Sequence, residues 1–360
     1  MKNLDNFCRD FWRNKKVLIT GHNGFKGSWL SLLLMKFGAE ISGISLKNDD
    51  PNALFNKLGI KKDIFEKIID IRNFNLTKDA VSTFSPDIIF HLAAQPLVRE
   101  SYLKPVDTWS TNVMGTISIL QAIRELKKKV IFVGITTDKV YHNNEWIYGY
   151  RENDKLGGID PYSSSKAAAE LAINAWKNSF AYNSNLLISS ARSGNVIGGG
   201  DYAKDRIIPD IFRSIKENEV LNIRNPKSTR PWQHVLEPLW GYILLAEKMN
   251  EDLSFSDSYN FGPEFSSNKT VQDVVDTFSK IVKIKYKIKT SNESYKESKL
   301  LHLVSEKSKT KLNWNPIWDF EKTIYRTAIW YDKLQKNISN ELTLCLEDIE
   351  EFIKDQNLRK

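Results

Sequence analysis

The sequence predicts an α/β fold in which a doubly wound parallel sheet is accompanied by a smaller C-terminal α/β domain. Three observations support this fold class. Short apolar runs alternate with helix-forming segments between residues 16 and 192, at the spacing of parallel strands joined by helices. A glycine-rich loop directly follows the first of these runs. A Tyr-x-x-x-Lys pair opens a helix after the fifth.

Composition and charge indicate an ordinary globular protein, with 360 residues of which 41% are hydrophobic and 27% charged. The net charge of +8 is dispersed, and Lys127-Lys128-Lys129 is better explained as a helix C-terminus than as a nucleic-acid site. A modest positive field also suits a small anionic substrate. No apolar run is long enough to span a bilayer, and Cys8 and Cys345 lack metal-ligand spacing. We therefore expect a cytoplasmic protein that binds neither nucleic acid nor membrane and holds no metal.

The first strand, Lys16–Thr20, leads into a glycine loop over residues 21–27 and then a helix expected over residues 28–37. Strand, glycine loop and helix in this order are typical of a Rossmann dinucleotide site. The glycines allow a tight turn and close approach to a pyrophosphate, which the helix N-terminus would bind. The spacing is G-x-x-G-x-x-G, so a glycine turn without a ligand is the alternative. The residues assigned to the cofactor here are Gly21, Gly24, Phe25, Lys26 and Gly27.

The second strand, expected over residues 41–45, does not decide between NAD and NADP. An acidic residue at the end of this strand favours NAD, whereas an arginine favours NADP. Ser45 is neither, Asp49 and Asp50 follow a little late, and Lys47 could approach a 2′-phosphate.

Further strands are expected over residues 67–70, 87–94, 130–136 and 186–192. Ligands of open α/β sheets bind outside the carboxyl ends of the strands. We therefore expect an adenine ring near Asp70 and Ile71. The next strand ends in Leu92, Ala93 and Ala94, whose small alanines would let the cofactor pass close to the backbone.

Two polar residues of this region are expected to have structural roles. His91 is interpreted as a packed strand histidine rather than a ligand. Asn112, on a helix expected over residues 107–126, is interpreted as a buried polar brace under the active site.

The fifth strand ends in Thr136-Thr137-Asp138-Lys139, a run of hydroxyl, acid and amine side chains. Tyr162 and Lys166 follow, four residues apart on a helix that Pro161 opens, so their side chains share one face. A lysine ammonium beside a phenol favours the phenolate, and we predict that Lys166 lowers the pKa of Tyr162 toward neutrality. Such a group is a general base suited to a sugar hydroxyl.

After Arg192 the pattern loosens into loops that suit a nucleoside diphosphate. The run Gly198-Gly199-Gly200 suits close approach to a ligand, and a helix is expected over residues 208–216. Arginines near aromatic residues can bind phosphate and stack a base, although ordinary surface arginines are the alternative. The candidates are Arg206, Arg224 and Arg230.

Three parts are expected along the chain. Residues 1–195 form the dinucleotide-binding domain, to which some later segments return. Residues 196–330 form mainly the sugar-nucleotide domain, with helix and strand over 268–288. Residues 331–360 form a charged helical tail without visible chemistry.

Together these motifs resemble the extended short-chain dehydrogenase/reductase superfamily and, within it, the nucleotide-sugar 4,6-dehydratases. The resemblance covers about residues 10–320. The glycine loop and Tyr-x-x-x-Lys mark only the superfamily. The His-Asn-Gly-Phe-Lys-Gly loop, Thr-Asp-Lys and Arg-Pro-Trp-Gln-His runs are more specific to the dehydratases. Val304 stands where the family pattern has an aspartate, which puts a sugar-domain contact or a turn in doubt.

The resemblance implies a hydro-lyase with tightly bound NAD that is regenerated in each cycle, acting on CDP-glucose in deoxysugar biosynthesis for a surface polysaccharide. It implies that Tyr162 takes the C4 hydroxyl proton as hydride leaves for NAD, with Thr137 hydrogen-bonded to the C4 oxygen. Asp138, if protonated, would protonate the departing 6-hydroxyl. Tyr162 and Lys166 would also contact the cofactor. The substrate would be bound by Gln95, Asn195, Arg206, Arg224 and Arg230.

Lys139 is the open member of the catalytic set. Related dehydratases place a glutamate here as the base for C5, and a lysine can serve only when it is uncharged. The alternative is that Lys139 positions Asp138 or a hydroxyl.

Other functions stay open at this point. Another nucleotide-sugar dehydratase or a 4-epimerase would share the superfamily motifs, although an epimerase does not need the pair Asp138-Lys139. A non-catalytic dinucleotide-binding protein is a more distant alternative.

The superfamily also suggests a homodimer, possibly a tetramer, through the helices that carry Asn112 and Tyr162. The apolar positions available for such an interface could equally belong to the core. They are Val113, Ile117, Leu120, Leu171 and Trp176.

Overall fold

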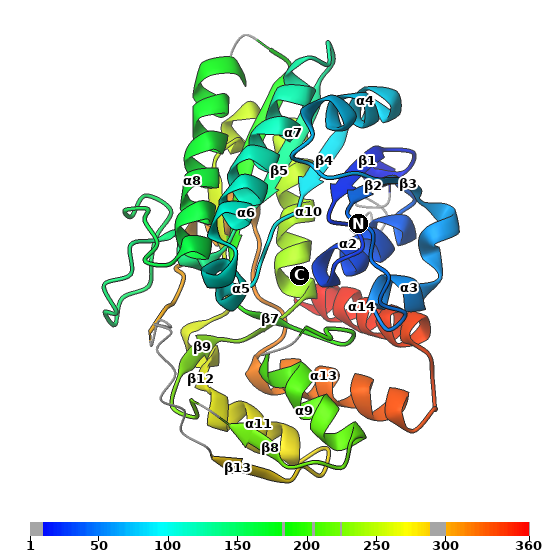
Figure 1. The fold of residues 1–360 in the computed structure, drawn as a ribbon, viewed down its shortest axis with the longest axis vertical. Coiled ribbons are helices and arrows are strands. Elements are labelled where there is room, and N and C mark those ends of the chain that lie inside the picture. The colour runs from blue at the N-terminus through cyan, green and yellow to red at the C-terminus, as the bar shows by residue number, and fades with distance from the viewer. Residues whose placement is uncertain (1–9, 182–183, 204–205, 224, 289–299, 360) are drawn as a thin grey trace.

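The structure, a computed structural model, describes residues 10–359 apart from residues 182–183, 204–205, 224 and 289–299 (Figure 1). Its centre is a seven-stranded sheet in the order β11-β6-β5-β4-β1-β2-β3, in which all neighbouring strands run parallel. This order, with crossovers in both directions from β1, confirms the doubly wound fold class. The strands are β1 Lys16–Thr20, β2 Glu40–Ser45, β3 Phe65–Ile68, β4 Ile88–His91, β5 Val130–Ile135, β6 Leu186–Ser193 and β11 Ser258–Phe261.

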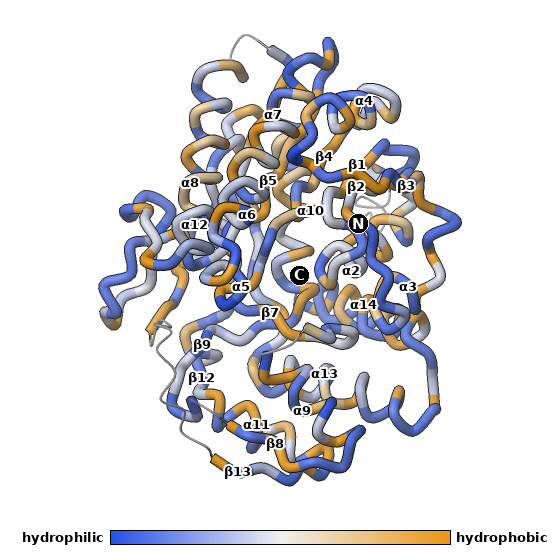
Figure 2. Tube along the Cα trace, viewed as in Figure 1, coloured by the Kyte–Doolittle hydropathy of each residue, from blue (hydrophilic) through white to orange (hydrophobic). Residues whose placement is uncertain are grey.

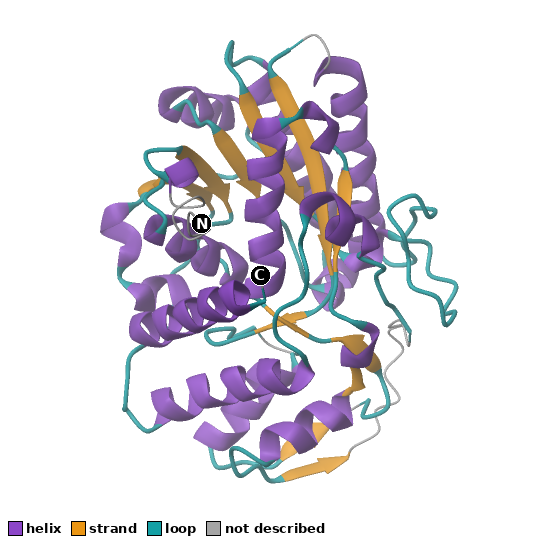
Figure 3. Ribbon diagram, turned by 180° about the vertical axis from the view of Figure 1, so that it is seen from behind, coloured by secondary structure: helices purple, strands orange, loops and turns teal. Residues whose placement is uncertain are grey.

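Helices cover both faces of this sheet (Figures 1 and 3). The side chains of a strand alternate between the faces, so Leu18 packs with one helical layer while Val17 and Ile19 pack with the other. Figure 2 shows apolar residues along the inner strands and the adjacent helices. One layer is formed by α4 Phe74–Phe84, α7 Gly115–Arg124 and α8 Pro161–Trp176, and the other includes α2 Phe25–Lys36 and α10 Leu236–Glu251.

A smaller lobe lies beyond the carboxyl ends of the strands (Figure 1). In it β8 pairs with β13 in parallel and β9 pairs with β12 in antiparallel orientation. The expected helix at 208–216 and the helix and strand over 268–288 are confirmed. The elements are α9 Ile207–Lys216, β8 Leu221–Ile223, β9 Thr229–Pro231, β12 Asn268–Thr270, α11 Val271–Ser279 and β13 Tyr286–Ile288.

Shorter elements and the C-terminal helices complete the described chain. They are α3 Leu54–Leu58, α5 Val98–Leu103, α6 Pro105–Trp109, the π-helical turn η2 Ser110–Met114, β7 Val196–Ile197, β10 Gln233–His234, α12 Glu306–Leu312, α13 Phe320–Gln335 and α14 Glu341–Leu358. The chain returns from the smaller lobe twice. In the first return α10 packs on the large sheet and β11 pairs with it, and in the second α14 packs near α3. The boundary near residue 195 stays a prediction.

The helix after the glycine loop begins at Phe25, three residues earlier than expected. A Cβ on Gly27 would lie 2.1 Å from the carbonyl oxygen of Gly21, so Gly27 belongs to the first helical turn, where the helix packs on the loop. The glycine run therefore serves both the turn and the start of α2.

Part of the space beside the run Gly198-Gly199-Gly200 is occupied by side chains of the protein, and part of it faces the cleft. A Cβ on Gly199 would lie 2.0 Å from the ring of Trp330, and one on Gly200, at φ +81, would lie 2.6 Å from Leu54. The expectation that all three glycines serve a ligand is wrong for Gly199, because α13 occupies that space. The C-terminal helices are part of the core, where the free Cys345 is buried.

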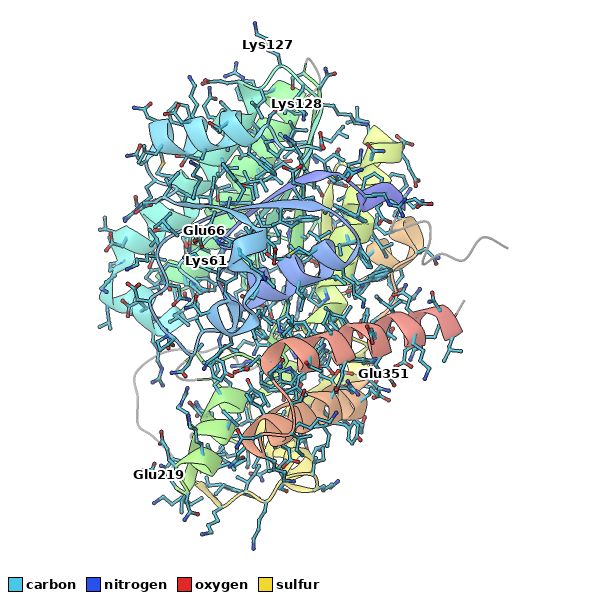
Figure 4. The ribbon with its side chains drawn as sticks, turned by 90° about the vertical axis from the view of Figure 1, so that its right-hand side faces the viewer. Lys61, Glu66, Lys127, Lys128, Glu219 and Glu351 are labelled. Carbon is cyan, nitrogen blue, oxygen red and sulfur yellow. The ribbon has the colours of Figure 1, made fainter. Side chains whose placement is uncertain are left out.

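Charges are spread over the surface, as Figure 4 shows with Lys127 and Glu219 at opposite ends of the molecule. Lys128 pairs with Asp87 at 2.8 Å, at the edge of the sheet remote from the smaller lobe. Within the described ranges, no helix is both long and apolar enough to cross a bilayer. The same ranges hold no cluster of three His, Cys, Asp or Glu side chains placed to bind a metal.

Val304, the departure from the family pattern, lies in an extended segment beside Tyr150. Its N–H donates to the carbonyl of Tyr150 at 2.9 Å, and its own carbonyl accepts from Asn260 Nδ2 at 3.1 Å. The backbone of this segment is therefore held without an aspartate side chain.

Candidate active site

A cleft of about 1350 Å³ runs along the carboxyl ends of the strands and down to the smaller lobe. A pocket for one drug-sized ligand measures about 300–1,000 Å³, so this cleft has room for two ligands placed end to end. It is bordered by the glycine loop, by the ends of β2, β4, β5 and β6, by the start of α8 and by β8 and β9.

The glycine loop forms one end of the cleft and fits a pyrophosphate. Gly21 has φ +73, and a Cβ on it would lie 2.9 Å from the backbone nitrogen of Ala93, so only glycine fits between β1 and β4. Gly24 is the N-cap of α2, has no side-chain cap and borders the cleft. The first turn of α2 holds no acidic residue, which leaves the positive helix N-terminus available to an anion.

The adenosine end of the cleft favours NAD. Ser45 ends β2 and borders the cleft, and its buried hydroxyl has no hydrogen-bond partner among the described residues. A ribose hydroxyl would satisfy this group. Lys47 also borders the cleft, where its exposed side chain pairs with the exposed Asp49 at 2.7 Å, so the charge that it could offer to a 2′-phosphate is partly offset. Other assigned residues that border the cleft are Asp70, Ile71, Leu92, Ala93 and Ala94.

The structure brings together the catalytic candidates from two separate segments. Thr137 and Lys139 follow β5, Tyr162 and Lys166 lie on α8, and all four border the cleft. The Thr137 hydroxyl interacts with the Tyr162 phenol and donates its proton to Asp138 Oδ1 at 2.9 Å. A continuous polar chain therefore runs from the phenol through Thr137 to the Asp138 carboxyl.

The prediction that the pKa of Tyr162 lies near neutrality is wrong for the protein groups alone. Burial raises the pKa of Tyr162 to about 12, and the hydrogen bond to Thr137 offsets only part of this effect. The Lys166 ammonium donates to the carbonyl oxygen of Ile135 at 3.2 Å. Burial also lowers the pKa of Lys166 to about 8, while Glu170 acts in the opposite direction.

Asp138 lies immediately behind the residues that border the cleft. It is fully buried, and its Oδ1 accepts from Thr137 and from Lys139 Nζ, the latter at 3.0 Å. Its Oδ2 has no hydrogen-bond partner in the described part of the chain and would contact a Cβ on Gly194 at 3.1 Å. Lys139 Nζ also donates to Asn195 Oδ1 at 3.3 Å, so its ammonium bridges two segments at the cleft wall.

Two structural expectations are confirmed. Asn112 lies in the π-helical turn η2 and braces two segments: its Nδ2 donates to Ser165 Oγ at 2.8 Å and to the Gln95 carbonyl at 3.1 Å. His91 is buried, with its ring nitrogens 2.7 Å from Thr20 Oγ1 and 3.0 Å from Thr116 Oγ1. The Gln95 side chain donates to Thr108 and is absent from the cleft wall.

Lys26 extends from the glycine loop to the catalytic end of the cleft. Its ammonium donates to Ser193 Oγ at 2.8 Å and to the Tyr242 hydroxyl at 3.4 Å. Burial, with further contributions from Arg206 and Lys166, lowers the pKa of Lys26 to about 7. Sequence reasoning missed Ser193 and Tyr242, because Tyr242 is 216 positions from Lys26 and carries no motif of its own.

The structure describes some, but not all, of the residues predicted to bind the substrate from the smaller lobe. Arg206 and Arg230 border the cleft, and Arg206 pairs with the buried Asp201 at 2.9 Å. Asn195 also borders the cleft. Arg224 lies outside the described residues.

Comparison with known proteins agrees with this site. A family model described as GDP-mannose 4,6 dehydratase matches residues 18–327. A CDP-glucose 4,6-dehydratase of Salmonella typhimurium is 44% identical over 334 residues, which cover 90% of this chain and 92% of the relative.

Two solved structures share the fold at low sequence identity. The dTDP-glucose 4,6-dehydratase of Bacillus anthracis, in complex with NAD, has a TM-score of 0.74 at 22% identity and covers 89% of this chain and 98% of its own. A UDP-glucose 4-epimerase of Thermotoga maritima with UDP-glucose also has a TM-score of 0.74, at 20% identity, covering 89% and 99%. Dehydratases and epimerases therefore share this architecture.

The dinucleotide cleft, the Tyr-x-x-x-Lys pair on α8 and the Thr-Asp-Lys run after β5 agree with the sequence comparisons. The chain belongs to the GDP-mannose 4,6-dehydratase family of nucleotide-sugar dehydratases, within the extended short-chain dehydrogenase/reductase superfamily.

Proposed function

We propose that this chain is a CDP-glucose 4,6-dehydratase, which converts CDP-D-glucose to CDP-4-dehydro-6-deoxy-D-glucose and water for deoxysugar biosynthesis. The observation that carries the proposal is the Thr137–Asp138–Lys139 run beside Tyr162 in a cleft large enough for two ligands. The 44% identity to a CDP-glucose 4,6-dehydratase supports the nucleotide and the reaction.

NAD is the proposed cofactor, held at the glycine loop and along the ends of β2 and β4. When bound it accepts a hydride from C4 and returns one to C6, and its oxidised nicotinamide ring carries a positive charge. The protein groups proposed to hold it are Gly21, Gly24, Phe25, Lys26, Gly27, Asp70, Ile71, Leu92, Ala93, Ala94, Tyr162 and Lys166.

Tyr162 is the proposed base for the C4 hydroxyl proton. Because burial raises its pKa to about 12, the phenol needs nearby positive charge to act at neutral pH. Lys166, one helical turn away, supplies such charge. Thr137, which interacts with the phenol, is the proposed hydrogen-bonding partner of the C4 oxygen.

Lys139 and Asp138 are the proposed base and acid for the elimination. A proton passed from Lys139 Nζ to Asp138 Oδ1, across 3.0 Å, leaves an amine and a carboxylic acid side by side. The amine can then take the C5 proton while the acid protonates the departing 6-hydroxyl, and water leaves. After the elimination both residues are in their starting charge states. Lys139 can then return the proton to C5, and the proton that Tyr162 took from the C4 hydroxyl restores the ammonium through Thr137 and Asp138.

The proposed substrate contacts are Asn195, Arg206 and Arg230, which border the cleft. Arg224 stays a candidate from the sequence. We leave out Gln95, because its side-chain amide bonds to its own loop and to Thr108.

A 4-epimerase is the alternative function, since an epimerase shares the fold. It would not need an acid and a base on the C5–C6 side of the sugar. Incubation of the purified protein and NAD with CDP-glucose, UDP-glucose, dTDP-glucose and GDP-mannose separates the functions. We expect an alkali-developed 4-keto absorbance and a mass loss of one water only with CDP-glucose. A C4-inverted sugar of unchanged mass would contradict the dehydratase.

A cytoplasmic location and a homodimer, possibly a tetramer, are further proposals. Exposed apolar side chains on α5, α6, η2 and α8 support an interface formed by these helices. Leu171 belongs to this face at 60% exposure, whereas Leu120 is buried in the core beside the sheet and the half-buried Trp176 packs against that core. The other exposed members are Leu103, Val106, Trp109 and Met114.

A further inference from the structure

A buried ion pair lies directly behind the catalytic helix and is not used in the mechanism above. Glu170 follows Lys166 by one turn on the same side of α8, and its carboxylate lies 2.7 Å from Arg192 Nη2 on β6. Both side chains are almost completely buried, at 2% and 4% exposure. A buried ion pair of this kind is weak evidence for stability, because desolvation of the two charges opposes their attraction. A role in the reaction therefore needs to be considered.

The Glu170 carboxylate is fully hydrogen-bonded to the strands that end at the active site. Its Oε1 accepts from Thr136 Oγ1 at 2.5 Å, and its Oε2 accepts from Ser190 Oγ at 2.7 Å as well as from Arg192. Thr136 directly precedes Thr137 in the chain, so this contact holds the point at which β5 leads into the catalytic turn.

Arg192 is also held by hydrogen bonds of its own. The position of the Glu170 carboxylate, which pairs with Arg192, is therefore fixed as well. Arg192 Nη1 donates to the Tyr141 hydroxyl at 2.8 Å and to the Glu152 carbonyl at 2.9 Å. Tyr141 in turn donates to Asn260 Oδ1 on β11 at 2.7 Å. The pair is thus anchored across the ends of β6 and β11.

We propose that Glu170 is a positioning residue for the dehydration, which fixes the β5 turn through Thr136 and keeps the neighbouring Lys166 ammonium charged. This inference deepens the proposed function and depends on it. Glu170 contacts neither ligand directly, because both oxygens of its carboxylate are used by Thr136, Ser190 and Arg192 and it lies one helical turn beyond Lys166.

The charges around Lys166 support the second half of the proposal. Burial lowers the pKa of Lys166, and Glu170 is the neighbour that opposes this shift. Besides Tyr162 on α8 itself, the titratable groups of the described residues that interact with Lys166 include Lys26 from α2 and His91 from β4. Neither can replace a carboxylate, because one is a cation and the other has its pKa lowered to about 3 by burial and by Lys166 itself.

The test separates the charge of Glu170 from its hydrogen bonds. The single variant Glu170→Gln leaves Arg192 buried without a counter-charge, so the double variant Glu170→Gln/Arg192→Met, which removes both charges, is made as well. Ser190→Ala removes one hydrogen bond to Glu170 and keeps its charge, so it is the matched control. Thr136→Val removes the link to the β5 turn alone. Circular dichroism and thermal melting confirm that each variant is folded.

Two readouts are measured on each variant as full-length protein. The first is the titration of Lys166, followed by competitive acetylation with acetic anhydride over a pH series and mass spectrometry, which needs no activity. The second is kcat and KM for CDP-glucose against pH with NAD at saturation.

In the double variant we expect the titration midpoint of Lys166 to fall by at least about one pH unit. The alkaline limb of the kcat–pH profile of this variant should move to lower pH by the same amount. Ser190→Ala should show neither change. Thr136→Val should lower kcat at least about tenfold with the Lys166 midpoint unchanged. A double variant with the wild-type midpoint and pH profile, or Thr136→Val with wild-type kcat, overturns the corresponding half of the proposal. If wild type does not dehydrate CDP-glucose, the proposed function fails, while the Lys166 titration still decides the charge relationship.

Discussion

Lys139 Nζ lies 3.0 Å from Asp138 Oδ1 at the wall of the cleft. The second oxygen of this carboxyl is buried and has no hydrogen-bond partner among the residues that the structure describes. A single proton shift across this contact converts an ion pair into the neutral amine and acid that an elimination requires. The two groups proposed for the elimination are therefore adjacent residues of one 3-10 turn, η3 Asp138–Val140.

Lys139→Ala should abolish C5 chemistry while C4 oxidation persists, because Tyr162 and Thr137 are left intact. We expect exchange of the C5 proton with solvent deuterium and loss of water each to slow by about 10²–10⁴-fold, the usual contribution of a general base. Single-turnover mass spectrometry in deuterium oxide measures both. Rapid C5 exchange in this variant would leave Lys139 as a positioning residue.

Asp138→Asn tests the proton shift itself. If Lys139 becomes an amine by passing its proton to Asp138, the amide variant should lose C5 exchange as well as dehydration. The same deuterium experiment measures it. C5 exchange at the wild-type rate, with dehydration blocked, would show that Lys139 acts as a base independently of Asp138.

Tyr162→Phe should lower kcat by about 10²–10⁴-fold, because it removes the proposed base for the C4 hydroxyl. The fold should be retained, since the ring keeps its packing and the phenol is hydrogen-bonded only to Thr137 in the described contacts. Steady-state assays and circular dichroism measure the two effects. A variant retaining more than about a tenth of wild-type kcat would remove Tyr162 from the mechanism.

The rate should fall at alkaline pH as Lys166 loses its proton. Burial lowers the pKa of Lys166 to about 8, so the ammonium that assists Tyr162 is progressively lost above that pH. Lys166→Arg, whose guanidinium stays charged, should move the alkaline limb of kcat/KM to higher pH even where overall activity falls. An unchanged limb in this variant would assign the titration to another group.

Glu237 should make folding stability fall as pH rises. Burial raises its pKa from 4.5 to about 8, although the N–H groups of Ile317 and Trp318 donate to it. The folded state therefore holds a proton that the unfolded state releases, and this stabilisation is complete below the ordinary pKa and is lost as pH rises through about 8. The slope can reach about 1.4 kcal/mol per pH unit.

Urea denaturation of wild type and Glu237→Gln over this pH range measures the effect. The neutral variant should become more stable relative to wild type as pH rises. The exposed Glu219→Gln is the control and should show no such trend. A constant difference between wild type and Glu237→Gln would show that Glu237 has the same charge in both states.

Gly199→Ala should destabilise the fold by about 1–3 kcal/mol, the usual effect of an overpacked core. The added Cβ would lie 2.0 Å from the buried ring of Trp330, which has no room to move aside. Gly24→Ala is a suitable contrast, since its Cβ would meet only the Gly21 carbonyl, at 3.4 Å. Equal melting temperatures for wild type and Gly199→Ala would contradict the close packing of α13 on this loop.

The sequence by itself determined six of the seven strands of the sheet, but not β11, together with the glycine turn and the side chains proposed as the catalytic set. Each of these depends on local patterns: apolar runs for strands, glycine where a Cβ would collide with Ala93, and the i, i+4 spacing that places Tyr162 and Lys166 on one side of α8. The family likewise followed from short runs that carry chemistry.

Only the tertiary structure decided the charges and the supporting contacts. The pKa of Tyr162 is raised because burial outweighs the neighbouring groups, and no spacing along the chain reports burial. The partners of Lys26, the place of Gly199 against Trp330 and the Glu170–Arg192 pair each join residues distant in sequence. Such contacts form only when strands and helices from separate segments pack together. The neighbours of each residue along the chain therefore give no sign of its partners or of its burial in the folded protein.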